Sequence, residues 1–458
     1  MSAWPFARHE LLSLRRDRRA WAACACLFVL LVAAFVSSAQ MHRAYERTRS
    51  AAQVASHRQW LTQGTKNAHS AAHFGEYAFR PLPALAPFEP GLHGVIGTTV
   101  YLEAHKENDL RDAPDEDGSR LTYLDGSAAF LARTVLPLLV FLLVAASIAG
   151  ERERGTLKML LAQGATLPRI VLGKTLAFGV LLAGLTFGAA LVASVVNAAE
   201  IVRVAGLAAS YLLFALAALF LAMVVSMGAR DSRRAVVVLF AFWAVGMVLG
   251  PRVAASVAQA VAPMPLRSEA QADLERDLDP AGHEQRTAAL RARVLAENGV
   301  ARVEDLPMDF RGIALQADEE RGYGIFDRHR AALRAREARQ ETVLRGASVL
   351  LPWLALDQAS TAFAGTDLRH AEHFADAAEA HRRTLVGAMN RYVTTARGKD
   401  ADASLWETIP AFAYEAPGAR FAFGYAWTSL LVLLGWAALP FGAMLHRARR
   451  SHEIGEAA

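Results

Sequence analysis

Six long apolar runs constrain the fold of this chain more than any other feature. Each reaches the roughly 20 residues that an α-helix needs to cross a hydrocarbon core of about 30 Å. The runs lie at residues 20–39, 127–150, 170–199, 204–227, 235–262 and 421–445. Of the 458 residues, 53% are hydrophobic, and the 20% that are charged fall mainly in separate blocks. We therefore predict an all-α polytopic membrane protein with six transmembrane helices.

Basic residues near the ends of these runs predict the orientation, because cytoplasmic flanks of transmembrane helices carry an excess of Lys and Arg. Four basic clusters occur at residues 15–19, 152–169, 230–234 and 447–450. An even number of spans puts all four on one side, so we predict that both termini are cytoplasmic. This topology also accounts for the net charge of +5, and we expect no nucleic-acid partner.

The topology divides the remaining residues between the two sides of the membrane. Two large, mainly helical external regions are expected, with helices around 285–297 and 329–344 in the second. Cys24 and Cys26 both lie in the first apolar run, so the external regions must fold without disulfides. The expected segments outside the spans are a cytoplasmic amphipathic elbow at 1–19, external regions at 40–126 and 263–420, cytoplasmic segments at 151–169 and 228–234, and a cytoplasmic tail at 446–458.

Two apolar segments carry prolines that change their interpretation. The fifth run contains Gly250 and Pro251, so we expect it to kink or end there. Residues 348–364 are apolar but contain Pro352 and Asp357. We expect this segment to rest on the outer membrane interface, because a seventh span would put the basic residues after the last run outside.

The segment at 151–169 is dense in charge although it lies between two apolar runs. Residues 151–161 read Glu-Arg-Glu-Arg-Gly-Thr-Leu-Lys-Met-Leu-Leu. Leu157, Leu160 and Leu161 recur at helical spacing, so a short helix here has an apolar stripe beside its charges. We interpret it as a helix at the cytoplasmic membrane surface that a soluble partner can bind. A basic loop that only sets the topology is the alternative.

The sequence contains no recognisable catalytic constellation. Gly173, Lys174 and Thr175 resemble the end of a phosphate-binding loop, but that loop requires a glycine where Pro168 stands. The HExxH, GxSxG and CxxC patterns are absent. We predict that the chain is not an enzyme and has no nucleotide site of its own. The spans also lack acidic residues in their middles, which argues against an ion-coupled carrier.

Residues 151–161, together with Pro168-Arg169 and Gly173-Lys174, resemble the signature that follows the second span in permease subunits of type-2 ABC transporters. Six spans with a large loop after the first are also similar to that family. A second large external insertion before the last span resembles a NosY-like branch of largely unassigned function, as do residues 306–315, 364–367 and 370–390. These insertions are larger than those of drug or polysaccharide exporters, which argues against a simple small-drug exporter.

The resemblance implies a permease of the bacterial inner membrane that couples ATP hydrolysis by a separate cytoplasmic ATPase to substrate export or force transmission. The chain itself would bind no cofactor, because ATP and Mg²⁺ would bind the ATPase. A second copy or a related permease would complete the unit in the lipid bilayer, and the external regions leave room for a periplasmic partner. By position, the coupling helix and the turn after the fourth span would supply the ATPase contact through Glu151, Glu153, Gly155, Thr156, Leu157, Leu160, Leu161, Arg230 and Asp231.

Two other functions stay open. A membrane-anchored scaffold or sensor would bind a ligand through its external helices and need no energy coupling. A metal-handling permease, similar to copper-maturation systems, would use His370, His373 and His381, which fall on one helix begun by a Thr366 or Asp367 cap. Histidine is also a common residue on helix surfaces, so we predict no metal site and keep these three as candidates.

Overall fold

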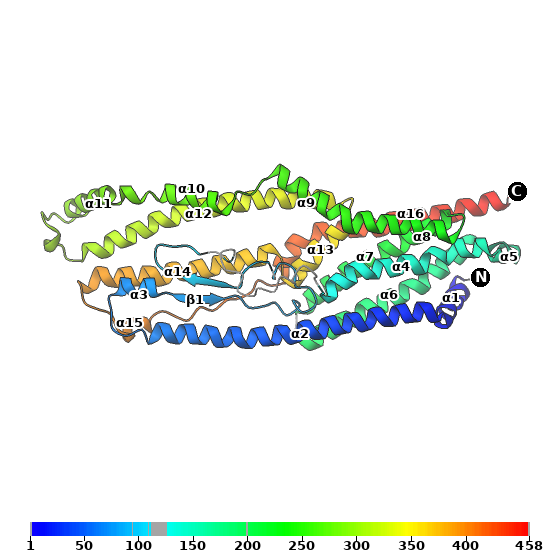
Figure 1. The fold of residues 1–458 in the computed structure, drawn as a ribbon, viewed down its shortest axis with the longest axis horizontal. Helices are drawn as coiled ribbons and strands as arrows, with labels where there is room; N and C mark the ends of the chain where they lie inside the picture. Colours follow the sequence, from blue (N-terminus) through cyan, green and yellow to red (C-terminus); the bar gives the residue numbers. More distant parts are fainter. Residues whose placement is uncertain (1, 94, 109, 111–125, 198–199, 457–458) are drawn as a thin grey trace.

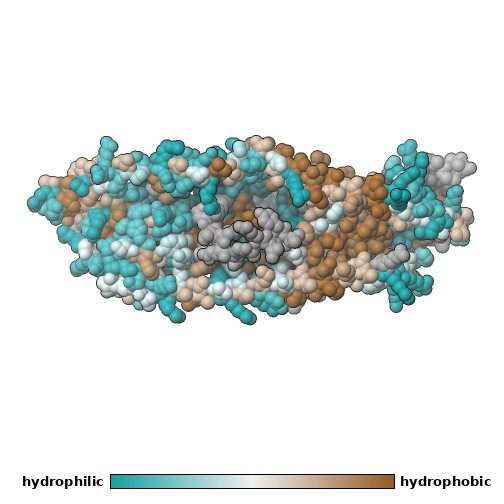
Figure 2. All heavy atoms as spheres, in the orientation of Figure 1, coloured by the Kyte–Doolittle hydropathy of each residue, from teal (hydrophilic) through white to brown (hydrophobic). Residues whose placement is uncertain are grey.

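The computed structural model describes residues 2–93, 95–108, 110, 126–197 and 200–456. The molecule is elongated, and most helices run along its length (Figure 1). Both termini lie at one end, which we call the terminal end; the part at the opposite end is the distal region. An apolar band crosses the molecule between hydrophilic surfaces on both sides (Figure 2). This pattern matches a belt that faces hydrocarbon.

Six helices of the described residues are long and apolar enough to cross a membrane, which confirms the predicted six-span, all-α fold. Because hydrocarbon offers no hydrogen-bond partner, each crossing segment must satisfy its backbone internally. Residues 198–199, at the predicted end of the third span, lie outside the described residues. The six are α2 (Arg18–Leu61), α4 (Ala128–Glu153), α6 (Leu167–Asn197), α7 (Ile201–Gly228), the helix Ser232–Val261, and α16 (Ala419–Glu456).

The first span does not end where its apolar run ends. Helix α2 has 44 residues, roughly 66 Å at 1.5 Å per residue, and continues far into the distal region (Figure 1). Near its end Trp60 is fully buried, and its indole N–H donates to the carbonyl oxygen of Trp406 at 3.1 Å. The membrane span and the first part of the external region are therefore one continuous helix.

The fifth span changes its helical geometry just before the predicted break. It consists of α8 (Ser232–Ala244), a π-helical turn at Val245–Leu249, and α9 (Gly250–Val261). The Gly250 N–H donates to the carbonyl oxygen of Val245. Pro251 has no N–H to continue the normal ladder, so a wider turn at this point lets the helix proceed.

The segment expected at the outer interface is the 13-residue helix α13 (Pro352–Ala364), and it is buried in protein. It packs between α7 and α16. A Cβ on Gly206 of α7 would lie only 2.6 Å from Cζ of Phe363, and one on Gly246 would lie 2.8 Å from Cε3 of Trp353. These glycines let α13 approach the bundle closely, so the segment is enclosed by protein rather than lying on its surface.

The distal region is built from both insertions. The predicted helix at 285–297 is confirmed as α11, whereas the one at 329–344 is only the second half of α12. That helix begins earlier because Asp309 caps it by accepting from the Arg311 N–H at 2.8 Å. The elements are α3 (Ala68–Phe74), β1 (Glu76–Phe79), β2 (Thr99–Leu102), α10 (Arg267–Leu278), α11 (His283–Glu297), α12 (Phe310–Ser348), α14 (Leu368–Ala396) and α15 (Ala403–Trp406).

The two insertions share a common core. Strands β1 and β2 pair antiparallel, with Glu76 opposite Leu102; this small sheet was not predicted. Its buried residues Ala78 and Val100 belong to the same apolar cluster as Phe374 of α14. The external regions, expected as two, therefore fold as one body.

Gly206→Ala should destabilise the protein, because the new Cβ would clash with the buried ring of Phe363. Overpacking of this kind costs about 1–3 kcal/mol, against the ~1 kcal/mol that alanine gains over glycine in a helix. The midpoint of thermal unfolding of the purified protein should fall. Gly435→Ala on α16 is the matched control, since nothing lies within 4 Å of its Cβ. Equal midpoints for the two variants would contradict the tight packing of α13.

Candidate functional site

The predicted coupling segment lies at the terminal end as the short helix α5 (Thr156–Ala162), between α4 and α6 (Figure 1). Gly155 precedes it with a φ of 76°, in the left-handed region. Nothing lies within 4 Å of the Cβ that another residue would carry there. Backbone conformation rather than space therefore favours glycine, and this residue marks the corner where α5 leaves α4.

Helix α5 has an inward and an outward face. Leu157 is 7% exposed and packs into the main apolar core of the bundle, and Leu160 packs partly against the same core. Met159 and Leu161 are 58% and 39% exposed. The predicted leucine stripe is thus divided: Leu157 anchors the helix, whereas Leu161 faces outward beside Met159.

Lys174 of α6 connects three helices through its charge. Its Nζ lies 2.8 Å from Glu151 Oε1 on α4 and 2.5 Å from Glu10 Oε2 on α1 (Trp4–Arg16). All three side chains are at most 14% exposed. Glu151, one of the residues predicted to touch an ATPase, is part of this buried ion network.

The predicted amphipathic elbow is helix α1, and one of its faces is covered by α6. A Cβ on Gly173 would lie 2.6 Å from the Ala3 carbonyl oxygen, so only glycine permits this approach. Ala7 is fully buried in the same contact region, whereas Trp4 is exposed. The glycine and lysine of the Gly173-Lys174 pair therefore both hold α1 against the bundle.

The end of α4 is fastened to the turn between α7 and α8. The Arg152 guanidinium donates to the carbonyl oxygens of Met227, at 2.9 Å, and Ala229. Glu153 Oε2 accepts from the Ser232 hydroxyl at 3.0 Å. These contacts join the corner before α5 to the second predicted contact region.

Two predicted residues lie in the turn itself. Asp231 caps α8 by accepting from the Arg234 N–H at 2.9 Å, and Arg230 is exposed. A Cβ on Gly228 would lie 2.9 Å from the Arg447 guanidinium, so α16 also packs here. Asp231 thus shapes the turn, whereas Arg230 is open to a partner.

The nine predicted coupling residues therefore do not form one surface. Glu151 and Leu157 point inward, and the Thr156 hydroxyl donates to the carbonyl oxygen of Glu151 at 3.1 Å. The exposed side chains on α5, on the preceding corner and on the α7–α8 turn include Arg154, Lys158, Met159, Leu161 and Arg230.

A second buried charge-bearing group lies at the distal side of the bundle. Glu89, in the loop between β1 and β2, is 1% exposed. It accepts hydrogen bonds from the hydroxyls of Ser360 (α13) at 2.6 Å and Tyr211 (α7) at 3.2 Å. Burial raises the pKa of Glu89 to about 7, although Arg133, which pairs with Asp357, opposes the increase. This carboxyl group titrates near neutrality.

The histidines kept as metal candidates do not come together. His370 and His381 are 11 positions apart on α14, roughly 16 Å along a helix axis, too far to share an ion. His370 pairs with Asp367 at 2.5 Å, and His373 Nδ1 lies 3.1 Å from the Tyr414 hydroxyl. The predicted cap at Asp367 is confirmed by its hydrogen bond from the His370 N–H at 3.0 Å.

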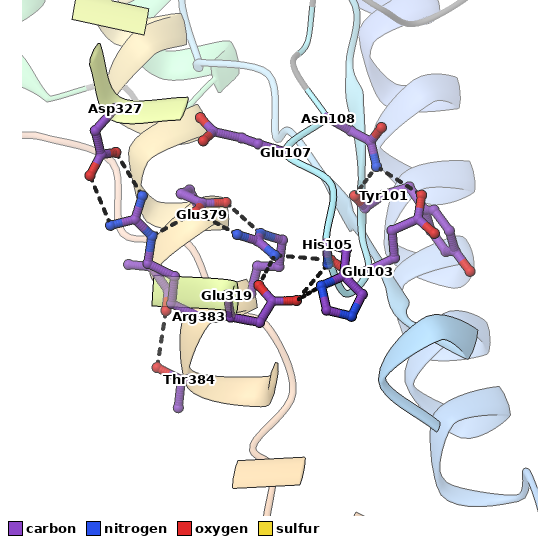
Figure 3. Close-up of polar contacts among 12 residues, drawn as sticks. Tyr101, Glu103, His105, Glu107, Asn108, Glu319, Asp327, Glu379, Arg383 and Thr384 are labelled. Carbon is purple, nitrogen blue, oxygen red and sulfur yellow. Dashed lines mark hydrogen bonds and ion pairs between the residues drawn. The ribbon is translucent and has the colours of Figure 1, made fainter. Parts of the chain in front are cut away.

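An ion network joins the two insertions in the distal region (Figure 3). Arg382 of α14 is 1% exposed and donates to Glu379 at 2.7 Å, Glu319 of α12 at 3.4 Å and the Glu103 carbonyl oxygen at 3.0 Å. His105 Nδ1 lies 3.0 Å from Glu319. Burial alone would raise the pKa of Glu319, but hydrogen bonds from His105 and the charge of Arg382 lower it.

The burial of Lys174 and Glu89 was not predicted. Lys174 carried a signal, because a lone cation inside an apolar helix needs a partner. Glu89 lies among prolines in a loop without periodic pattern, so nothing local indicated that α7 and α13 would enclose it.

Comparison with known families agrees with this architecture. Residues 76–255 match the family described as ABC-2 type transporter. The chain contains an ABC-2 type transporter membrane domain. Residues 267–415 match a domain of unknown function, DUF3526. No curated protein matches the chain.

The two matched regions are not separate bodies in space. The ABC-2 domain includes α4 to α8 and the first part of α9, and the DUF3526 region includes α10 to α15. Helix α13 of the DUF3526 region nevertheless packs on α7 of the ABC-2 domain. The two matched regions are therefore in direct contact.

Lys174→Met should destabilise the terminal end, because Glu10 and Glu151 would lose their buried cation. Removing one partner of a buried ion pair costs on the order of 3–5 kcal/mol. The thermal unfolding midpoint of the purified protein should fall, whereas Lys158→Met, on the exposed face of α5, should leave it unchanged. Equal midpoints for both variants would show that the ion network adds no stability.

Glu89 should make stability depend on pH. Between its unfolded pKa of 4.5 and its folded pKa of about 7, the folded chain holds a proton that the unfolded chain releases. Stability therefore falls as pH rises through this range, by on the order of 3 kcal/mol from this group. In unfolding scans at pH 5 and pH 8, wild type should gain stability relative to Glu89→Gln at the lower pH. A difference that is constant with pH would contradict the raised pKa.

Proposed function

We propose that this chain is the permease subunit of an ABC exporter in the bacterial inner membrane, driven by a separate cytoplasmic ATPase. The observation that carries the proposal is the outward apolar face of α5 at the corner of an ABC-2 domain. ABC-2 permeases work with ABC ATPase subunits, so ATP and Mg²⁺ would bind the partner. Both termini lie at the same end as α5 (Figure 1), which supports a cytoplasmic terminal end.

The proposed docking face consists of Arg154, Lys158, Met159 and Leu161, with Arg230 beside it, all of them exposed. Apolar side chains flanked by cations suit a groove with an apolar floor and an acidic rim. This set revises the one predicted from the sequence. Residues that point inward would hold α5 in position rather than touch the ATPase.

The contacts behind α5 supply a route for movement. Helix α4 precedes α5 in the chain. Lys174 would couple α4 to α6 and α1, and Arg152 would couple α4 to the α7–α8 turn. Helices α4 and α7 extend to the distal side of the bundle. There Arg133 of α4 pairs with Asp357 of α13. Tyr211 of α7 donates to Glu89, which also accepts from Ser360 of α13. A shift of α5 would reach α13 through continuous helices and buried contacts, which serves substrate export and force transmission alike.

A second permease would complete the transporter. Of the most apolar 18 residues in α2, and likewise in the fifth span, only 11% are buried within this chain. Lipid covers part of these faces, and a second copy or a related permease would cover the rest. This arrangement gives two ATPases one docking face each.

Co-purification tests the proposal. The tagged full chain, taken from its native membrane in mild detergent, should retain an ABC ATPase identifiable by mass spectrometry, and the eluate should hydrolyse ATP in the presence of Mg²⁺. The double substitution Met159→Asp and Leu161→Asp should lower ATPase recovery at least about tenfold, equivalent to 1.4 kcal/mol of docking energy, because two charges would enter an apolar contact.

Val95→Asp is the matched control, since Val95 is 83% exposed in the distal region, where no ATPase should dock. Native mass spectrometry of the same eluate counts the permeases. Absence of an ATPase, as expected for a scaffold or sensor, or equal recovery with the docking variant, would rule the proposal out.

A further inference from the structure

Three histidines of the first insertion meet in the distal region. His69 and His73 lie one turn apart on α3, and His105 follows β2. One ring nitrogen from each lies within 4.8 Å of those of the other two. The Nε2 atoms of His69 and His73 are 3.2 Å apart. The three rings thus surround a common point.

The backbone holds α3 firmly against the segment that carries His105. The Ala104 N–H donates to the Ala72 carbonyl oxygen at 3.0 Å, and the Tyr101 hydroxyl donates to the Phe74 carbonyl oxygen at 2.6 Å. Gly75 ends α3 with a φ of 57°, and a Cβ there would lie closer than 3.0 Å to the backbone of Leu102. The backbone therefore places the three histidines close together, whatever rotamers their side chains adopt.

His105 is held in an unusual conformation by a carboxylate. Its φ is 62°, in the left-handed region that non-glycine residues rarely adopt. Glu319 of α12 accepts from the His105 backbone N–H at 2.6 Å and contacts Nδ1 of the ring at 3.0 Å (Figure 3). Nε2 is therefore the ring nitrogen left for a ligand. Strain of this kind persists only where surrounding contacts enforce it, and it concentrates at functional sites.

We propose that His69, His73 and His105 bind one late first-row transition-metal ion, such as Zn²⁺ or Cu²⁺. Imidazole nitrogens are the ligands these ions favour. Zn–N bonds of 2.0–2.1 Å in tetrahedral geometry place ligand nitrogens about 3.4 Å apart, close to the 3.2 Å between His69 and His73. A carboxylate behind a ligating histidine, as Glu319 lies behind His105, is the usual way to orient such a ligand.

Three protein ligands leave a fourth position on the ion. His73 is exposed, so this position opens to solvent, where water or an external molecule can occupy it. The bound ion would also connect α3 to the segment after β2 and, through Glu319, to α12. The proposal does not depend on an ATPase partner.

Metal titration of the full chain tests the site. The protein, with a tag that contains no histidine, is stripped with a chelator and titrated with Zn²⁺ in detergent. We expect one Zn²⁺ per chain by elemental analysis, a higher thermal unfolding midpoint with Zn²⁺, and nitrogen hyperfine structure from imidazole in the electron paramagnetic resonance spectrum after Cu²⁺ loading.

His73→Ala and His105→Asn should each weaken Zn²⁺ binding at least about tenfold and remove the Zn²⁺-dependent rise in the midpoint. Asn is used at position 105 because it tolerates a left-handed backbone, and His73 is exposed, so both variants should fold. His446→Ala, at the exposed terminal end, is the control and should bind as wild type does. Unchanged affinity in both site variants, or a stoichiometry far below one, would overturn the proposal.

Discussion

The hydrocarbon of a bilayer accepts no unpaired backbone group, and the rest of this structure depends on that constraint. Each crossing is a helix, and charged residues collect at the two ends of the bundle. The helices do not stop at the apolar band: α2 continues until Trp60 packs beside Trp406, with ring centroids 5.8 Å apart. The distal region is therefore continuous with the membrane helix α2.

Buried charge is handled differently at the two ends of the bundle. Lys174 is balanced by Glu10 and Glu151, so its charge is compensated by permanent partners. Glu89 accepts two hydroxyl hydrogen bonds, and burial brings its pKa to about 7. The first arrangement suits a fixed connection between helices near the proposed docking face. The second links α7 and α13 through a carboxyl group whose pKa is raised by burial.

Local sequence patterns predicted much of the candidate site but not its orientation. The spacing of Leu157, Leu160 and Leu161 indicated a helix, and α5 is one. Which leucine faces outward depends on how α5 packs against α4 and α6, and this information lies in distant residues. His370 and His381 were candidate metal ligands because they share one face of a helix. They are three turns apart, however, so their side chains do not come close. His69 and His73 are only one turn apart on α3. His105 is brought next to them by the pairing of β1 with β2, which the sequence did not predict.

The sequence by itself determined the number and helical character of the spans. The length and apolarity of each run are local properties, and the thickness of the bilayer fixes how long an apolar helix must be to cross it. The same holds for the cap at Asp367, where a short polar side chain suits the start of a helix. Tertiary structure alone decided the burial of α13, the partners of Lys174 and the single core of the two insertions. Those features arise from contacts between residues far apart in the chain, and no local pattern encodes which distant surfaces will meet.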